Sequence, residues 1–468
     1  MDPGLVGRSR LMFECTGSDV CPLCIKSDMT GSMPRPMEQR RFRTDARAGT
    51  DSAATARTAS STGIPHAAVP PWTAALRFAR DPRTLGVLRA GPRVGAFLLQ
   101  GVHSRFGSEP SLSEFALRPS PLMALQALVD EVLIALFHHP DLIPDDADFA
   151  PAGADVDRAR RLFAQRGWLE NPASFHRQPP PPEDDEASFE RSPVLGYEHL
   201  TFTSGYEPYE GEPGRTRWLS HEANRTVHAS IAAVPGRRRS WLICAPGFGM
   251  GTNAFIDLHA FRAPRLLSNG VNVAVPVLPL HGLRATGRVR GEDLMTIDMV
   301  DSLHGIAQAV WDVRRLLQWL YVRQGAERVG IVGYSFGALV AALVAALEPD
   351  LACVVAGIPL VDLPALFLRH SNRHVAELAS TYGVLGEPAN EVHRVVSPLA
   401  MPCQIPRGSR YIFAGRGDRM STFEQAVRLW NHWDRPSFVA YQGGHVGFFW
   451  SKAARRLMDE AVDAWLVG

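Results

Sequence analysis

The chain has 468 residues and a formal net charge of +1; 46% of its residues are hydrophobic and 21% are charged. This composition is typical of a globular protein, and the length allows one large core with accessory segments. Because the net charge is close to zero, the charge balance does not favour binding to nucleic acid or to an anionic membrane surface. We therefore expect no nucleic-acid partner and no membrane association.

Residues 1–66 are expected to be disordered or to precede the native start of the protein. Residues 48–63 consist of Ala, Thr, Ser, Arg, Asp and Gly and show no apolar period. If the start is mis-assigned, Met33 or Met37 is the first residue. The N-terminus lacks an apolar core followed by a small-residue cleavage site, so no secretory signal is visible and we expect a cytoplasmic protein.

The cysteines are too few and too scattered to form a disulfide framework in a chain of this length. They are Cys15, Cys21, Cys24, Cys244, Cys353 and Cys403. Cys244 and Cys353 lie within apolar runs and are expected to be buried. The C-x-x-C pair of Cys21 and Cys24 has no second pair of Cys or His to complete a zinc site. We expect neither a metal nor another cofactor.

Residues 67–175 form a predicted helical region. Apolar residues from Leu122 to Leu136 recur at helical spacing, and a further helix is expected over residues 156–165. Residues 176–192 are a predicted linker, because their four consecutive prolines and four consecutive acids cannot form a helix or a central strand. We place a domain boundary within this linker.

From residue 193 to residue 468, short apolar runs alternate with helical stretches, which indicates an α/β fold with a mostly parallel sheet and helices on both faces. Residues 199–203 and 226–234 alternate in polarity like antiparallel strands. The near-continuous apolar runs that buried parallel strands require lie at residues 241–244, 271–278, 329–332, 351–356, 411–414 and 438–441.

The sharpest motif is a Gly-x-Ser-x-Gly sequence at residues 333–337, with Ser335 at its centre. It follows a predicted strand and opens a predicted helix, the context in which this motif forms a tight turn that exposes the serine hydroxyl. The glycines remove Cβ atoms that would clash in the turn, and the helix directs its positive end at a developing anion. Ser335 is the predicted nucleophile; a purely structural Gly-Ser turn is the alternative interpretation.

A serine nucleophile needs a base and an acid to orient that base. His445 follows the last apolar run and two glycines, ahead of a C-terminal helix, and is the predicted base. Asp418 follows the preceding apolar run and is the predicted acid that holds the imidazole tautomer. An N-cap for the next helix is the structural interpretation of Asp418, and Asp362 is the alternative acid.

Two backbone amides are expected to form an oxyanion hole. One belongs to Phe336, directly after the nucleophile, and the other to Phe248 in the glycine-rich turn at residues 245–251. A phosphate or dinucleotide loop is the alternative interpretation of this turn. Its spacing matches neither G-x-G-x-x-G nor G-x-x-x-x-G-K-[ST], and it contains no lysine, which argues against that alternative.

Together these residues resemble the α/β-hydrolase superfamily over residues 193–468. The resemblance is carried by residues 246–249 (Pro-Gly-Phe-Gly, where the family often has His-Gly), the motif at 333–337, Gly417-Asp418 and residues 443–445 (Gly-Gly-His). Residues 396–399 are similar to a segment of prolyl-oligopeptidase and dienelactone-hydrolase relatives. Residues 279–284 are similar to a segment of the abhydrolase-domain-eighteen type of proteins. The resemblance implies the α/β-hydrolase fold, with a mostly parallel, eight-stranded sheet.

The resemblance also implies acyl transfer from a small-molecule carboxylic ester or thioester to water, with no cofactor. A small helical cap over the site is expected at about residues 362–395. A serine peptidase of the prolyl-oligopeptidase type is one alternative, but the N-terminal region is predicted to be helical and shows no propeller repeat. A catalytically silent binding or scaffold protein is the other, and the presence of Ser, His and Asp together disfavours it. The natural substrate and the oligomeric state stay open.

Overall fold

The computed structural model describes residues 82–103, 117–137, 145–183, 186–191, 197–234, 240–286, 294 and 296–467. The predictions for residues 1–66, including those for the native start and for Cys15, Cys21 and Cys24, lie outside these ranges. Cys244 and Cys353 are buried, as predicted from the apolar runs that contain them.

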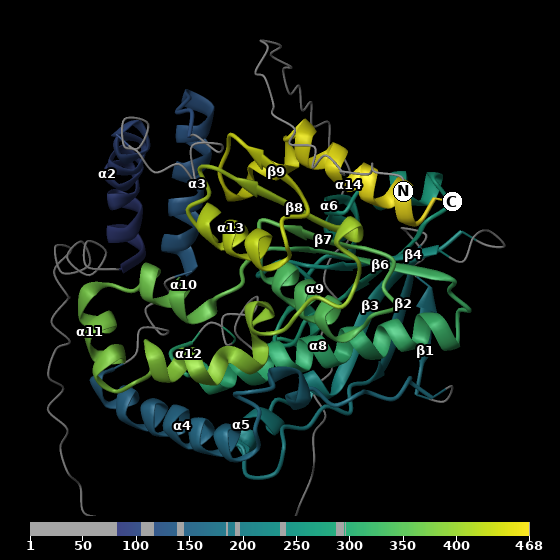
Figure 1. The fold of residues 1–468 in the computed structure, drawn as a ribbon, viewed down its shortest axis with the longest axis horizontal. Helices are drawn as coiled ribbons and strands as arrows, with labels where there is room; N and C mark the ends of the chain where they lie inside the picture. The colour runs from purple at the N-terminus through teal and green to yellow at the C-terminus, as the bar shows by residue number, and fades with distance from the viewer. Residues whose placement is uncertain are drawn as a thin grey trace, which may run out of the picture. The chain divides into compact units, whose positions relative to one another are not determined.

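A nine-stranded sheet lies at the centre of this part of the chain, in the order β1-β2-β3-β5-β4-β6-β7-β8-β9 (Figure 1). Its strands are β1 (Ser188–Arg191), β2 (Glu198–Thr203), β3 (Thr226–Ala232), β4 (Ser240–Ala245), β5 (Asn272–Pro276), β6 (Arg328–Tyr334), β7 (Val354–Gly357), β8 (Arg410–Gly415) and β9 (Ser437–Tyr441). β1, β2, β3 and β5 pair antiparallel, and the pairs from β5 to β9 are parallel. The sheet has one strand more than predicted. The additional strand is β1, an exposed edge strand within the predicted linker.

Helices cover both faces of the sheet, and alternating side chains of the central strands supply a core to each face. In β4, Ile243 belongs to the core that includes α8 (Met299–Val322), α9 (Phe336–Leu347) and α13 (Phe423–His432). Its neighbours Leu242 and Cys244 belong to the core that includes α6 (Ala254–Ala260), α7 (Ala263–Ser268) and α14 (Lys452–Trp465). A strand buried on both faces requires this alternation, which explains the continuous apolar runs in the sequence.

Short helical segments connect these elements. They are α5 (Arg215–Leu219), η3 (Pro172–Phe175), η4 (Glu222–Arg225), η5 (Gly282–Arg284), η7 (Arg394–Val396), η8 (Pro398–Ala400), η9 (Arg407–Ser409) and η10 (His445–Phe449). The stretch expected to form a cap contains three helices, which are α10 (Leu363–His370), α11 (Arg373–Thr381) and α12 (Glu387–His393). The end of α10 is fixed to the loop after β8 by a hydrogen bond of 3.0 Å between His370 Nε2 and the Met420 carbonyl.

Two helices of the N-terminal region, α2 (Pro82–His103) and α3 (Pro121–Phe137), lie side by side as an antiparallel pair (Figure 1). The start of α2 meets the end of α3 closely, since a Cβ added to Gly86 would lie 2.7 Å from the Cβ of Ala135. Among the described residues, no helix combines the length and the apolarity that a membrane crossing requires.

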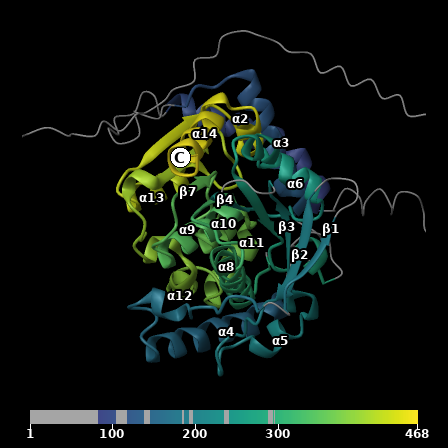
Figure 2. The ribbon, with the colours of Figure 1, turned by 90° about the vertical axis from the view of Figure 1, so that its right-hand side faces the viewer.

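A third helix of this region, α4 (Asp146–Gln165), lies alongside α12 in both ribbon views (Figure 1, Figure 2). The chain then runs along α8, where the predicted linker is held by two buried arginines. Arg314 donates to the Arg177 carbonyl at 2.7 Å, and Arg315 donates to the Pro180 carbonyl at 3.0 Å. The prolines exclude regular structure here, as predicted, but their free carbonyl groups are good acceptors for these arginines.

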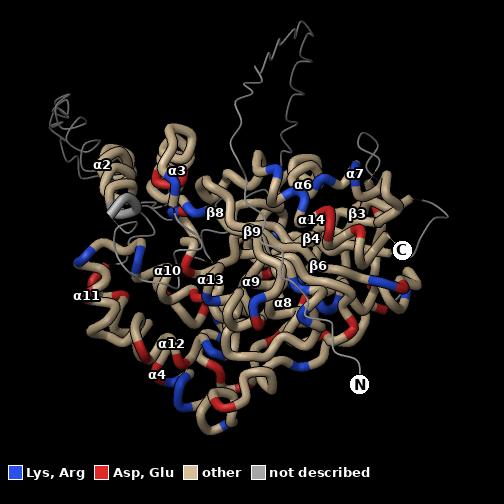
Figure 3. Tube along the Cα trace, turned by 45° about the horizontal axis from the view of Figure 1, so that its top comes forward, with Lys and Arg blue, Asp and Glu red and all other residues tan. Residues whose placement is uncertain are grey.

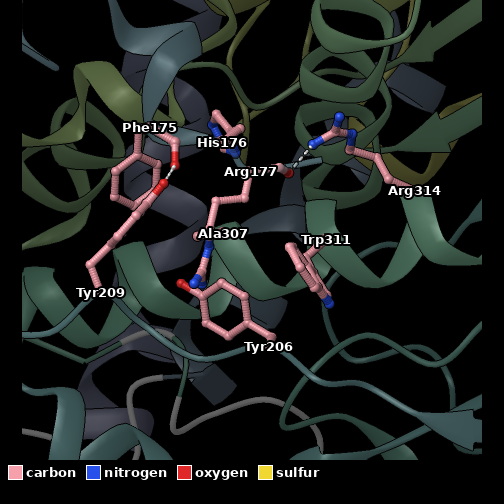
Figure 4. A pocket seen from close by; sticks show the side chains of 8 residues that line it. All are labelled: Phe175, His176, Arg177, Tyr206, Tyr209, Ala307, Trp311 and Arg314. Atoms are coloured by element: carbon pink, nitrogen blue, oxygen red, sulfur yellow. Dashed lines mark hydrogen bonds between the residues drawn. The ribbon is translucent and has the colours of Figure 1, made fainter. Parts of the chain in front are cut away.

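Aromatic side chains complete this attachment. The Arg177 guanidinium lies 4.5 Å from the ring centre of Tyr209 and 5.5 Å from that of Trp311 (Figure 4). Tyr209 in turn donates its hydroxyl to the Phe175 carbonyl at 3.0 Å. The cavity left among these side chains measures about 20 Å³, which is room for one water molecule rather than for a ligand. This region is therefore a packed support.

Candidate active site

Ser335 occupies a strained turn between β6 and α9. Its backbone has φ 55° and ψ −114°, a region that residues other than glycine rarely adopt. The flanking glycines permit the turn: a Cβ added to Gly333 would lie 2.0 Å from the Gly337 carbonyl oxygen, and one added to Gly337 would lie 2.1 Å from the Ala245 carbonyl oxygen. The strain places the serine at the carboxyl edge of the sheet, ahead of the N-terminus of α9.

His445 and Asp418 come from the loops after β9 and β8, and the structure brings them into contact. The Nδ1 of His445 lies 2.7 Å from Oδ2 of Asp418, and both residues are buried. The other carboxylate oxygen of Asp418 accepts hydrogen bonds from the amides of Met420 and Ser421, both at 2.9 Å. Asp418 thus holds its own loop and contacts the imidazole at the same time, but it does not cap the next helix, α13, whose N-cap is Thr422.

The electrostatics of the pair favour a protonated imidazole. Burial by itself lowers the pKa of His445, but the charge of Asp418, its hydrogen bond and the charge of Asp130 outweigh burial and raise the pKa above its ordinary value. An anion beside an imidazole stabilises the imidazolium form. The pair therefore has the property that a base needs when it takes up a proton during a reaction.

Asp362, the alternative acid, lies elsewhere. It caps α10 by accepting from the Ala365 amide at 3.0 Å, and its second oxygen accepts from Arg428 at 2.7 Å. The structure therefore pairs Asp418, and not Asp362, with His445.

The hydroxyl of Ser335 faces a second serine. Its Oγ lies 3.4 Å from Oγ of Ser421, which is long for a hydrogen bond between hydroxyl groups. Of the hydrogen bonds within the described chain, none joins Ser335 to His445. Catalytic hydrogen bonds are often long or unformed before substrate binds, so this arrangement is compatible with a nucleophile at rest.

The glycine-rich turn after β4 lies against the elbow. The Met250 amide bonds the Gly247 carbonyl at 3.2 Å, which closes a turn over Phe248 and Gly249. A Cβ added to Gly247 would lie 3.7 Å from the Cβ of Ser335. The turn that contains Phe248 therefore lies close to Ser335, and helix-start amides such as that of Phe336, the first residue of α9, have no partner within the helix.

His281 packs between these two segments. Its ring lies 5.5 Å from that of Phe248 and 6.1 Å from that of Phe336. Burial lowers the pKa of His281 to about 4, so the ring is neutral, and Nδ1 bonds the Pro279 carbonyl at 2.8 Å. His281 supports the two candidate oxyanion segments by packing.

Two residues of α3 were not predicted from the sequence. Gln126 and Asp130 are almost fully buried and accept hydrogen bonds from main-chain amides of the loops that carry Asp418 and His445. Figure 3 shows acidic and basic positions next to one another beside α3. The available signal was a glutamine and a carboxylate one helical turn apart inside an otherwise apolar helix, because buried charges are rare unless they are paired.

The strand order, the elbow and the two loops after β8 and β9 are those of an α/β-hydrolase fold. No family model matches the chain. Uncharacterized protein MT2702 and uncharacterized protein Rv2627c, from two strains of Mycobacterium tuberculosis, are each 36% identical to it over 378 residues, which cover 79% of this chain and 88% of the relative. The chain belongs to the same family as these two proteins.

Two solved structures have a similar architecture. Acetyl xylan esterase 1 from Thermoanaerobacterium sp. is 16% identical, with a TM-score of 0.44 over 63% of this chain and 93% of that chain. A cold-adapted esterase from an Arctic intertidal metagenomic library is 15% identical, with a TM-score of 0.38 over 60% of this chain and 97% of that chain.

Proposed function

We propose that the protein is a serine hydrolase that cleaves a carboxylic ester or thioester through an acyl-enzyme. The observation that carries this proposal is the Asp418–His445 contact of 2.7 Å at the sheet edge where Ser335 is held in a strained elbow. A structural serine turn has no need of a buried imidazole–carboxylate pair at the same edge of the sheet. These three groups are the ones that acyl transfer requires.

In the proposed reaction, the bond from Nδ1 to Asp418 keeps a proton on Nδ1 and leaves Nε2 of His445 as an acceptor. The Ser335 hydroxyl turns from Ser421 to His445, loses its proton to Nε2 and attacks the substrate carbonyl. The amides of Phe248 and Phe336 stabilise the resulting oxyanion. His445 then protonates the leaving group, and a water molecule, activated by the same imidazole, releases the acyl group and restores the serine.

The acyl group is proposed to be apolar. Of the aromatic residues next to the catalytic loops, Phe336 and Phe448 belong to the cores on the two faces of the sheet, whereas Phe449 is 42% exposed and Phe248 is half-buried. Trp450, directly after Phe449, is 64% exposed. Exposed aromatic side chains beside a catalytic loop can cover an aliphatic chain.

A fluorophosphonate probe tests the proposal, with the variants Ser335→Ala and His445→Ala beside the wild type. The wild type should be labelled and both variants should not, and p-nitrophenyl esters of increasing acyl length should then be hydrolysed. Because the base must be neutral, the labelling rate should rise with pH through a pKa above 6.5. A folded wild type that reacts with neither probe nor esters would show that the protein is not a serine hydrolase.

A further inference from the structure

One face of α3 is joined to both catalytic loops through buried polar side chains. Oε1 of Gln126 accepts a hydrogen bond from the Gly444 amide at 3.0 Å. One turn later, Oδ2 of Asp130 accepts from the His445 amide at 2.7 Å and from the Arg419 amide at 3.1 Å. A single carboxylate on a helix from the N-terminal region thus bridges the residue after the acid and the base itself.

The close contact with α3 leaves no room for a Cβ atom at the three glycines around His445. A Cβ added to Gly443 or Gly447 would lie 2.4 Å or 2.5 Å from Oε1 of Gln126, and one added to Gly444 would lie 2.8 Å from Oδ2 of Asp130. None of these three glycines has a positive φ, so the backbone conformation does not demand them. The close approach of α3 does.

The carboxylate of Asp130 is expensive to bury. Its side chain is fully buried, and its Oδ1 has no hydrogen-bond partner among the described residues. Burial, together with the charge of Asp418, raises the pKa of Asp130 to about 6. A neutral side chain would join α3 to the loops at a lower desolvation cost than a carboxylate. Attachment alone therefore does not explain why this position carries a charge.

We propose that Gln126 and Asp130 are positioning residues for His445, which makes α3 part of the catalytic apparatus; the inference rests on the proposed hydrolase function. Gln126 and Asp130 fix the main chain at residues 444–445 and at Arg419, and so fix the separation of the imidazole from Ser335. The anionic charge also favours the imidazolium that forms when the base takes up the proton. The groups that face Asp130 are Asp418, His445 and Tyr441, with Arg419 and Glu131 beside them.

Three variants separate positioning from mere attachment. Asp130→Asn keeps an accepting oxygen and removes the charge, and Gln126→Met keeps the length and removes the acceptor. Glu131→Gln is the matched control, since Glu131 is equally buried and binds Arg419 at 2.9 Å and Arg93 at 3.3 Å. It joins the same helix to the same loop but makes no contact with the main chain at residues 444–445.

The measurement is the rate of fluorophosphonate labelling as a function of pH, corrected for the folded fraction by thermal unfolding. We expect roughly 10- to 100-fold slower labelling for Asp130→Asn and Gln126→Met, and a pH limb moved to lower pH in Asp130→Asn alone. The rate per folded molecule should stay within about 3-fold of wild type for Glu131→Gln, because that change leaves the main chain at residues 444–445 in place. If Asp130→Asn does not fold, the inference is tested by comparing the labelling rates of Gln126→Met and Glu131→Gln.

Equal rates and equal pH limbs in all folded variants would overturn the inference, and so would equal losses in the control. Either result would leave the proposed function intact as long as the wild type is labelled and Ser335→Ala is not. An unreactive wild type would instead overturn the proposed function.

Discussion

Two parts of the N-terminal region attach to the α/β-hydrolase core in opposite ways. Along α8, the core supplies the donors: the side chains of Arg314 and Arg315 bind carbonyl groups of the proline-rich segment. At α3, the core supplies main-chain amides of two loops, and the N-terminal region supplies the acceptors Gln126 and Asp130. The first attachment ends on a regular helix, and the second ends on the loops that hold the candidate acid and base.

This contrast predicts which property of the protein each attachment supports. A helix such as α8 keeps its shape through its own backbone hydrogen bonds, so losing the proline-rich segment should cost stability and leave the site intact. A loop takes its shape from the groups that bind its backbone. Losing the α3 contacts should therefore cost catalytic geometry more than stability.

The largest effect, a loss in the free energy of unfolding, is expected from Arg314→Ala. The side chain is buried, and it binds Glu348 at 2.6 Å and the Arg177 carbonyl at 2.7 Å. Removing it leaves Glu348 buried without its guanidinium partner, which should lower the free energy of unfolding by about 3–5 kcal/mol. Chemical denaturation measures this loss, and the labelling rate per folded molecule should stay at the wild-type value.

Arg323→Ala is the control for this change. Arg323 binds Glu183 of the same segment at 3.4 Å, but the pair is exposed to solvent, so its removal should cost no more than about 1 kcal/mol. A large loss of labelling by folded Arg314→Ala would remove the contrast between the two attachments.

Gly444→Ala should slow labelling more than it lowers stability, which is the converse of the effect expected from Arg314→Ala. The backbone of Gly444 has φ −79° and ψ −173°, which alanine adopts freely, so only the contact with α3 resists the new methyl group. The added Cβ would lie 2.8 Å from Oδ2 of Asp130 and 2.9 Å from the backbone carbon of Gln126. Displacing the base loop by about 1 Å should slow labelling by about 100-fold.

Gly408→Ala provides the matched control, because a Cβ added to Gly408 meets no atom within 4 Å. It should change neither labelling nor stability. Wild-type labelling by Gly444→Ala would mean that α3 yields to the methyl group and does not constrain the loop.

The buried charge of Asp130 should appear in the pH dependence of stability. Its pKa is raised from 3.8 to about 6 by burial and by Asp418, so the folded state holds the proton more tightly than the unfolded state. The stability that Asp130 contributes therefore falls as pH rises from about 4 to about 6, by about 3 kcal/mol. Asp130→Asn has no such dependence, so wild type should lose stability relative to Asp130→Asn across this window. Denaturation of both proteins at pH 4, 5, 6 and 7 measures the difference, and a constant difference would contradict the raised pKa.

Much of the fold follows from local patterns in the sequence. The apolar runs and the glycine-flanked Ser335 could be assigned from neighbouring residues alone, because a buried parallel strand and a tight turn each need particular residues at neighbouring positions. The same holds for the loop positions of Asp418 and His445, which follow directly from the strands before them. The catalytic roles of the three residues are still predictions.

The contacts of α3 could not be predicted in this way. Asp130 and His445 are separated by 315 positions in the chain, and nothing near either residue specifies the other. Asp130 was given no role from the sequence, and the two glycines before His445 served only to locate the base. β1 was missed for a related reason: its residues are all exposed, so they lack the apolar alternation by which strands are recognised.

The smallest effect is expected at Ser421, on the loop that α3 holds. Its hydroxyl lies 3.4 Å from that of Ser335, a weak contact that should stabilise the resting serine by no more than about 0.5 kcal/mol. Ser421→Ala keeps the amide that binds Asp418, so the acid should stay in place. Freed from this contact, Ser335 should be labelled about 2-fold faster, whereas Ser174→Ala, in the segment on the α8 side, should leave the rate unchanged. A labelling rate that falls 10-fold or more in Ser421→Ala would instead mean that the Ser421 hydroxyl takes part in the reaction. The loop that α3 holds would then supply a second catalytic group in addition to the acid.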